Sequence, residues 1–210
     1  MGEPGEVTTV SEDGAALGWR SLAEVSQALA EATQSLEAVL GLVARRAVEL
    51  LGDGGALFLA SDDEAWLEPV AFDHRDPDGL LALRAMFASK PYRVADDDPI
   101  SQVFRTGRPV RLAELTPEEF EEAKPEYGEF FDRFPVHSLL AVPLRARGRT
   151  IGVLAAARHQ PGCPYTPADE DLLRELADRA ALGIANARLF AESERRVRQL
   201  GALRAIGGLA

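Results

Sequence analysis

The segment from His137 to Phe190 constrains the fold more than any other part of the chain, because it orders two apolar runs, a turn and a long helix. The apolar runs at 138–144 and 150–157 flank a short basic stretch at 145–149. Gly148 in that stretch has the backbone freedom that a tight hairpin needs. We therefore predict two antiparallel strands joined by a turn at the basic stretch.

A long helix is predicted directly after this hairpin. Thr166 is a good N-cap residue, and Pro167 suits the first helical position. The acidic run 169–171 falls in the first turn, where the helix dipole favours negative charge. No proline follows, so the helix is expected to continue to Phe190 and beyond it.

The N-terminal third contains a second helical pattern. Apolar side chains recur at intervals of three and four residues, as on a coiled-coil seam, at Leu22, Val25, Leu29, Ala32, Leu36, Val39 and Val43. The pattern fits one helix that continues to Leu51, or two helices with a break near Thr33–Ser35. We favour the break, because Ser35 is a good N-cap and Glu37 suits a first turn.

Between these helices the sequence alternates short strands and short helices. Strands are predicted at 56–60, 66–72 and 109–112, and helices at 78–89, from Asp98-Pro99 to Thr106-Gly107, and once or twice within 116–134. Helices before, between and after the strands indicate an α+β or layered αβα fold.

Composition limits the classes of partner. A chain of 210 residues usually holds one domain, at most two, and 46% hydrophobic residues are enough for a substantial core. The net charge of −11 opposes attraction to nucleic-acid phosphates and to anionic lipid. We therefore expect neither nucleic acid nor a membrane as a partner.

Several absences lead us to expect a cytoplasmic protein. Cys163 is the only cysteine, so an intramolecular disulfide is excluded. The N-terminus has neither the basic region nor the apolar region of a secretory signal. No apolar run approaches the roughly 20 residues that span a bilayer.

Five sequence words together resemble the GAF domain, a small sensory module of signalling proteins. They are Pro99-Ile-Ser-Gln-Val-Phe-Arg-Thr-Gly-Arg-Pro-Val-Arg-Leu112, Leu139-Leu-Ala-Val-Pro-Leu144, Ile151-Gly-Val-Leu154, the spacing Tyr165-x-x-x-Asp169-Glu170, and Gly183-Ile-Ala-Asn-Ala-Arg-Leu-Phe190. The resemblance implies a PAS-related α+β fold with a central, mostly antiparallel sheet of five to six strands. The N- and C-terminal helices would pack on one face, and pocket-forming short helices and loops on the other.

This resemblance divides the chain into three parts. Residues 1–17 are expected to be a flexible tail, and 18–190 the GAF domain. Residues 191–210 would begin an exit signalling helix or coiled coil that leads to an output domain not included in the chain. Such a domain would relay the binding of a small molecule or partner to an output such as a histidine kinase, a diguanylate cyclase or a phosphatase.

No enzymatic activity is expected within these residues. The sequence has no P-loop, no G-x-S-x-G word, no H-E-x-x-H word and no Rossmann glycine fingerprint. Cyclic-nucleotide binding is also not expected. Family members that bind cyclic nucleotides carry an Asn-Lys pair where this chain has Arg158-His159. The crossover segment before the hairpin is acidic and would repel a phosphate.

One cysteine and three histidines could attach or ligate a tetrapyrrole. Cys163 is followed by proline, whereas bilin-binding members typically have histidine after the attachment cysteine. His137 begins a predicted strand and could face a pocket as an axial haem ligand, but a hydrogen-bonded strand-end histidine is the commoner role. We therefore predict no cofactor and no metal, and keep a haem or redox sensor as an alternative function.

A ligand pocket is predicted beneath the crossover. Its candidate lining residues are Phe72, Met86, Phe104, Phe120, Tyr127, Phe130, Phe131 and His137. The alternative is that most of these side chains belong to the core. If a ligand exists, a small organic molecule with an apolar body is expected.

We also predict a parallel homodimer through the terminal helices, because apolar side chains continue past Phe190 at near-heptad spacing. The residues assigned to these dimerisation and signalling helices are Leu22, Val25, Leu29, Leu36, Ala187, Phe190, Val197 and Leu200. A purely structural dimerisation module without a ligand is the main alternative function.

Overall fold

The computed structural model describes residues 35–88, 92–114, 118 and 128–207. The predicted tail at 1–17 and the seam residues Leu22, Val25 and Leu29 lie outside this part. Among the helices of the described part, none is both long enough and apolar enough to cross a membrane.

Within the described residues, six antiparallel strands form one sheet in the order β3-β2-β1-β6-β5-β4. The strands are β1 (Gly54–Ala60), β2 (Trp66–His74), β3 (Tyr92–Arg93), β4 (Val110–Leu112), β5 (Ser138–Ala146) and β6 (Arg149–Arg158). The α+β class and the antiparallel sheet are therefore confirmed. The strand β3 was not predicted, because a pair of residues has no periodicity to read.

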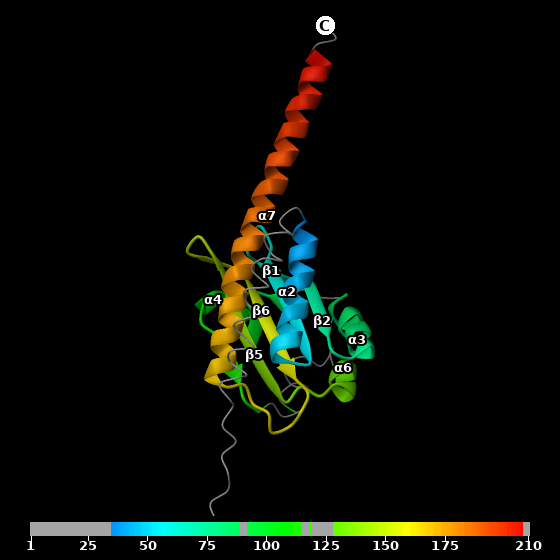
Figure 1. The fold of residues 1–210 in the computed structure, drawn as a ribbon, viewed down its shortest axis with the longest axis vertical. Helices are drawn as coiled ribbons and strands as arrows, with labels where there is room; N and C mark the ends of the chain where they lie inside the picture. Colours follow the sequence, from blue (N-terminus) through cyan, green and yellow to red (C-terminus); the bar gives the residue numbers. More distant parts are fainter. Residues whose placement is uncertain (1–34, 89–91, 115–117, 119–127, 208–210) are drawn as a thin grey trace, which may run out of the picture.

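In the part of the chain that the structure describes, five helices cover the two faces of this sheet. They are α2 (Leu36–Leu51), α3 (Pro77–Phe87), α4 (Pro99–Thr106), α6 (Gly128–Arg133) and α7 (Pro167–Gly207). Helices α2 and α7 pack against each other and on one face of the sheet (Figure 1). Helix α3 contacts β2, and helix α4 contacts β5 and β6. Helix α6 contacts α3. The second half of α7 continues away from the body of the domain (Figure 1).

Helix ends follow the predicted capping residues. Ser35 Oγ accepts from the amide of Ala38 at 3.3 Å, so α2 starts where the interpretation with a break places it. Asp98 Oδ1 accepts from the first amides of α4, and Gly107 ends that helix with a φ of 62°. Side chains that satisfy the free helix-end groups therefore set both boundaries.

The hairpin between β5 and β6 is tighter than the sequence indicated. Arg147 and Gly148 have φ values of 52° and 78°, and the strands pair as far as Ala146 and Arg149. The turn thus has two residues, whereas the predicted turn covered 145–149. Two left-handed residues give a turn whose twist matches the strands, so pairing continues up to it.

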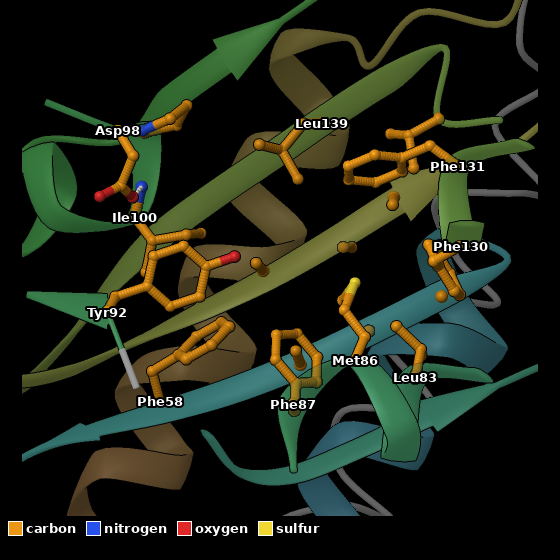
Figure 2. Close-up of a pocket in the computed structure, with 18 of the residues that line it drawn as sticks. Phe58, Leu83, Met86, Phe87, Tyr92, Asp98, Ile100, Phe130, Phe131 and Leu139 are labelled. Carbon is orange, nitrogen blue, oxygen red and sulfur yellow. Dashed lines mark hydrogen bonds between the residues drawn. The ribbon is translucent and has the colours of Figure 1, made fainter. Parts of the chain in front are cut away.

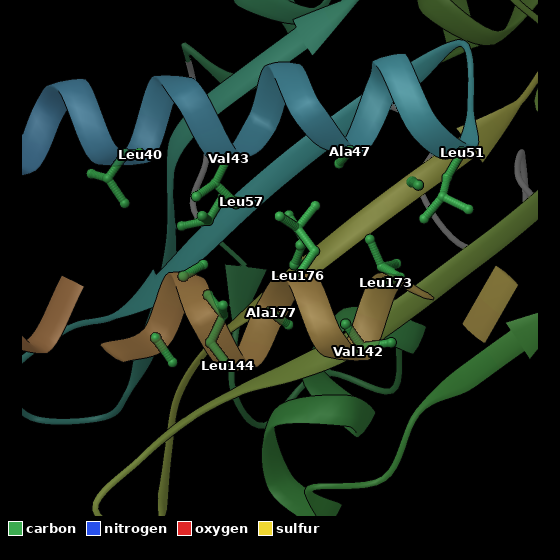
Figure 3. Close-up of a cluster of buried hydrophobic side chains, with 14 of the residues drawn as sticks. Leu40, Val43, Ala47, Leu51, Leu57, Val142, Leu144, Leu173, Leu176 and Ala177 are labelled. Carbon is green, nitrogen blue, oxygen red and sulfur yellow. The ribbon is translucent and has the colours of Figure 1, made fainter. Parts of the chain in front are cut away.

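The main core lies between the sheet and the helices α2 and α7 (Figure 3). It includes Leu40, Val43, Ala47 and Leu51 of α2, Leu173, Leu176 and Ala177 of α7, and Leu57, Val142 and Leu144 of the strands. Each large side chain buried there contributes about 1.5–3 kcal/mol. This face of the domain is filled, so any ligand space must lie on the other face.

Candidate ligand-binding pocket

A cavity of about 200 Å³ lies on the sheet face opposite the main core, between α3, α4 and α6 (Figure 2). It is lined by Gly54, Gly55, Ala56, Phe58, Leu83, Met86, Phe87, Tyr92, Asp98, Pro99, Ile100, Leu112, Phe130, Phe131, Val136, Leu139, Ala155, Ala156, Ala157 and His159. Nearly all of these side chains are apolar. A concave, apolar site with a few polar groups is the usual form of a small-molecule site.

Small residues on two central strands form the floor of the pocket. The segment 54–56 of β1 pairs with 155–157 of β6, and all six residues are glycine or alanine. Because no side chain there is larger than a methyl group, the sheet backbone itself approaches the cavity. Larger residues in this register would fill the space that a ligand needs.

Aromatic rings form two walls. On one side the ring of Phe58 meets Phe87 and Tyr92 edge to face, at centroid distances of 5.5 and 5.2 Å. On the other side Phe130 and Phe131 of α6 pack edge to face at 5.7 Å. Edge-to-face pairs hold rings in fixed orientations, so these walls are defined surfaces.

Two histidines form a hydrogen-bonded pair at one end of the pocket. Nε2 of His74, from the end of β2, lies 2.8 Å from Nε2 of His159, which follows β6 and lines the pocket. The rings of Phe130 and Phe134 pack around the pair. The backbone of α3 at Gly79 lies so close that a methyl group there would overlap the His74 ring.

The hydrogen bonds around the pair assign the tautomer of neutral His159. Nδ1 of His159 lies 2.9 Å from the carbonyl of Pro135, which can only accept, so this nitrogen carries the proton. Nε2 of His159 then accepts from Nε2 of His74, and Nδ1 of His74 accepts from the amide of Asp76 at 3.0 Å. Burial lowers the pKa of His159 below its ordinary 6.5, and the neighbouring His74 lowers it further. His159 is therefore neutral at pH 7.

Arg158 precedes His159 and connects β6 to α7. Its guanidinium donates to Asp169 Oδ1 at 3.0 Å and to the carbonyls of Leu51, Cys163 and Pro164. These contacts lie beside α7, and neither Arg158 nor Asp169 lines the pocket.

Tyr165 lies beneath this guanidinium, which stacks on its ring at 4.2 Å. The hydroxyl of Tyr165 is buried without a partner, and burial raises its pKa. Glu170, the last residue of the Tyr165-x-x-x-Asp169-Glu170 spacing, lies near Arg111 and Arg174. The three residues of this spacing therefore connect strands to α7, and none of them lines the pocket.

The structure brings three of the eight predicted pocket residues to the cavity: Met86, Phe130 and Phe131. Phe72 packs behind Phe87 at a ring distance of 5.6 Å, and Phe104 packs in the cluster around Val103. His137 is half-buried and donates its backbone amide to Arg158 without lining the cavity. Phe120 and Tyr127 lie outside the described residues.

Other lining residues were not predicted, notably Phe58, Tyr92 and His159. The paired small triplets at 54–56 and 155–157 were the available signal, because glycine and alanine in strand interiors often mark a close approach to a ligand. No local pattern relates His74 to His159, which are brought together by the pairing of β1 with both β2 and β6.

The predicted dimer residues fall into three groups. Leu36 packs against the main core, and Ala187 is 3% exposed and buried within its own domain. Phe190 is 52% exposed. On the same helix, Leu182 is 64% exposed and Leu189 is 43% exposed. Val197 and Leu200 lie on α7, but their side chains are outside the described part. The exposed apolar surface of α7 therefore includes Phe190 of the predicted seam but not Ala187.

A metal site gains no support from the described residues. Within 35–88, 92–114, 118 and 128–207, no three side chains of histidine, cysteine, aspartate or glutamate converge as metal ligands would.

The fold and the sequence place the chain in a known class of regulatory module. The sequence model of the GAF domain family matches residues 35–184, so the chain belongs to this family. Family members are typical of sensory and regulatory signalling proteins.

Individual relatives agree with this assignment. A 73-residue segment is 30% identical to the circadian input-output histidine kinase CikA of Synechococcus elongatus, and covers 35% of this chain and 10% of the kinase. The match therefore spans about a tenth of that relative. The second GAF domain of DevS from Mycobacterium smegmatis is 26% identical, with a TM-score of 0.55 over 78% of this chain and 99% of that one.

The similarity to a further solved structure concerns the fold alone. The GAF domain of a phosphoenolpyruvate-protein phosphotransferase from Coxiella burnetii has a TM-score of 0.64 at 22% identity. The superposition covers 85% of this chain and 98% of that one.

Proposed function

We propose that this GAF domain senses a small molecule in the pocket over β1 and β6 and relays its occupancy through α7 to an output domain, of which a histidine kinase is one example. The observation that carries the proposal is the apolar cavity between α3, α4 and α6, helices that lie across the sheet from α2 and α7 and make no substantial contact with either. Helices that cover a cavity can shift when it is filled, without disturbing the core.

Alternation along β5 and β6 supports the relay. Leu139 and Ala155 line the pocket, whereas their neighbours Leu140 and Leu154 are in the core that packs on α7. A movement of either strand toward a ligand therefore also moves side chains that touch α7.

The junction of β6 and α7 supports the same route. His159 lines the pocket, and Arg158 before it is joined to Asp169 in the first turn of α7. A shift at one end of the pocket would thus be carried to the start of the long helix. A ligand moves this equilibrium only as far as it binds one arrangement better than the other.

Native mass spectrometry of the chain, purified without denaturant, tests the first half of the proposal. We expect a retained small molecule, or one that a thermal-shift screen of a fragment library identifies. Met86→Trp fills the cavity and should abolish binding, whereas Leu81→Trp on the exposed face of the same helix should not.

Hydrogen exchange of the described part of α7 tests the second half. We expect a bound compound to change exchange within 167–190 in the wild-type chain and not in Met86→Trp. A chain that neither retains nor binds any compound would contradict the sensory proposal and favour a ligand-free dimerisation module. Binding without any change in α7 would contradict the relay alone.

A further inference from the structure

We propose that the pocket accepts an uncharged, planar molecule of one or two aromatic rings that carries one hydrogen-bonding N–H or O–H group. This inference rests on the proposed function, because it names the ligand class of the same site. It follows from the size of the cavity, the shape of its floor and the state of its polar groups.

The cavity volume limits the size of the ligand. An engineered apolar protein cavity of about 150 Å³ binds benzene, so the cavity of about 200 Å³ has room for one ring or two small fused rings. A tetrapyrrole is far larger than this space. The size therefore favours a ligand on the scale of phenol or indole.

The floor and the walls favour a planar ligand. On the pocket side, Gly54 and Ala56 of β1 and their partners Ala157 and Ala155 of β6 present only hydrogen atoms and methyl groups. Gly55 and Ala156 between them face the main core. A flat ring can lie on such a surface with contact over its whole face, whereas a puckered ring of the same mass contacts it at fewer points. Phe58, Phe87 and Phe131 then meet the ring from the sides (Figure 2).

The polar groups around the cavity exclude a charged ligand. Among the described residues that line it, only Tyr92, Asp98 and His159 have polar side chains. Oδ1 of Asp98 accepts from the amides of Ile100 and Ser101. Its Oδ2 has no hydrogen-bond partner, but it is buried beneath the surface of the cavity, so a ligand in the open space does not touch it.

His159 offers no charge to a ligand either. Both of its ring nitrogens are occupied, one by His74 and one by the carbonyl of Pro135. A carboxylate or ammonium group in the pocket would lose its hydration without gaining a counter-ion, which is strongly unfavourable. The site therefore discriminates against charge rather than for it.

Tyr92 provides the polar contact. Its hydroxyl points from β3 toward the middle of the cavity (Figure 2). A hydroxyl both donates and accepts, so it retains capacity for a ligand N–H or O–H even while it holds a partner in the protein. One polar group on an otherwise apolar ring matches this arrangement.

Calorimetric titration of the 210-residue chain with matched probes tests the inference. Indole is compared with indole-3-acetate and tryptamine, which add a negative or a positive charge to the same ring system. Phenol is compared with cyclohexanol, which has the same polar group on a puckered ring. We expect indole to bind with a Kd of about 1 mM or tighter, and each charged or puckered counterpart at least about tenfold more weakly.

Variants locate the binding. Met86→Trp and Ala157→Leu each reduce the cavity and should abolish indole binding, and Leu81→Trp is the control on the exposed face of α3. If one of the two cavity variants fails to fold, the other still decides. Tyr92→Phe should weaken indole about three- to tenfold and leave 1-methylindole, which has no N–H, unchanged.

Several outcomes would overturn the ligand class. They are equal or tighter binding of a charged probe, equal binding of cyclohexanol and phenol, indole binding that both cavity variants retain, and no binding of any probe. The sensory function fails separately, when native mass spectrometry and the fragment screen find no compound at all. A charged or alicyclic compound found in that screen, and displaced by Met86→Trp, would keep the function and refute the ligand class.

Discussion

Arg158 at the end of β6 donates to Oδ1 of Asp169 in the first turn of α7 at 3.0 Å, and this contact fixes the start of the long helix relative to the sheet. Asp169 in turn accepts from the amide of Thr166 at 2.7 Å, while Thr166 Oγ1 accepts from the amide of Asp169. The reciprocal cap and the ion pair therefore share one carboxylate. Removal of Arg158 should affect both the helix start and the loop before it.

Arg158→Ala should lower the free energy of unfolding by about 2–4 kcal/mol, because several carbonyl contacts and a largely buried carboxylate lose their partner. Arg149→Ala is the control. Its partner Glu64 and its own side chain are mostly exposed, so the expected cost is about 0–1 kcal/mol. Urea unfolding of both variants measures the difference, and equal costs would show that the Arg158 contacts add little.

The histidine pair should make stability depend on pH. The pKa of His159 is lowered in the fold, chiefly by burial, so below pH 6.5 the unfolded chain binds more protons than the folded one. Stability should therefore fall as the pH drops through 6.5 and level off below the folded pKa, and this group should contribute no slope above 6.5. The carboxylate of Asp53 opposes the shift and His137 adds to it.

Urea unfolding of wild type and His159→Gln between pH 4.5 and 8 isolates this effect, because the carboxyl groups titrate in both proteins. The difference in unfolding free energy between them should change across the window below pH 6.5 and stay constant above it.

Strand alternation should separate the cost of core and pocket truncations. Leu154 is fully buried in the main core, so Leu154→Ala should cost about 2–5 kcal/mol. Leu139 is half-buried and lines the pocket, so Leu139→Ala should cost less, about 1 kcal/mol, because the space it leaves joins an existing cavity. Denaturant unfolding measures both costs, and an equal loss would mean that the pocket side is packed like the core.

Local patterns predicted most of the fold and little of the pocket. The caps Ser35, Asp98 and Thr166 and the alternating runs of β5 and β6 are local signals, so the elements they define could be located. The short strand β3 has no such signal. Strand register decides which side chains face the pocket. Sequence periodicity does not give this register for β1, because its run mixes small and apolar residues.

Aromatic residues were the weaker guide to the pocket and small residues would have been the better one. Phe72 and Phe104 are aromatic and lie near the cavity, yet they pack behind its walls, because an aromatic side chain serves a core and a pocket equally well. The small residues of 54–56 and 155–157, by contrast, leave the floor open where Gly54, Ala56, Ala155 and Ala157 face the cavity. Their pairing joins segments about a hundred residues apart and requires the sheet order.

The last prediction concerns the exposed surface of α7. Leu182 and Leu189 lie seven residues apart on the side of α7 that faces away from the core, and Phe190 is beside them. This heptad spacing fits a parallel helix pair, and each leucine buried in it would contribute about 1.5–3 kcal/mol. We expect a homodimer through this surface, in place of a seam that includes the buried Ala187. Leu189→Asp should give a monomer, whereas Arg188→Glu, a control at an exposed neighbouring position, should not.

Sedimentation velocity at micromolar concentration measures this directly. The melting temperature of Leu189→Asp at low concentration should match the wild-type monomer, because the replaced side chain contributes mainly to the dimer contact. A wild-type chain that remains monomeric, or a dimer that neither Leu182→Asp nor Leu189→Asp disrupts, would exclude this surface as the interface. A dimer that only Leu182→Asp disrupts would place the contact nearer the domain body, since Leu182 precedes Leu189 by two turns of α7.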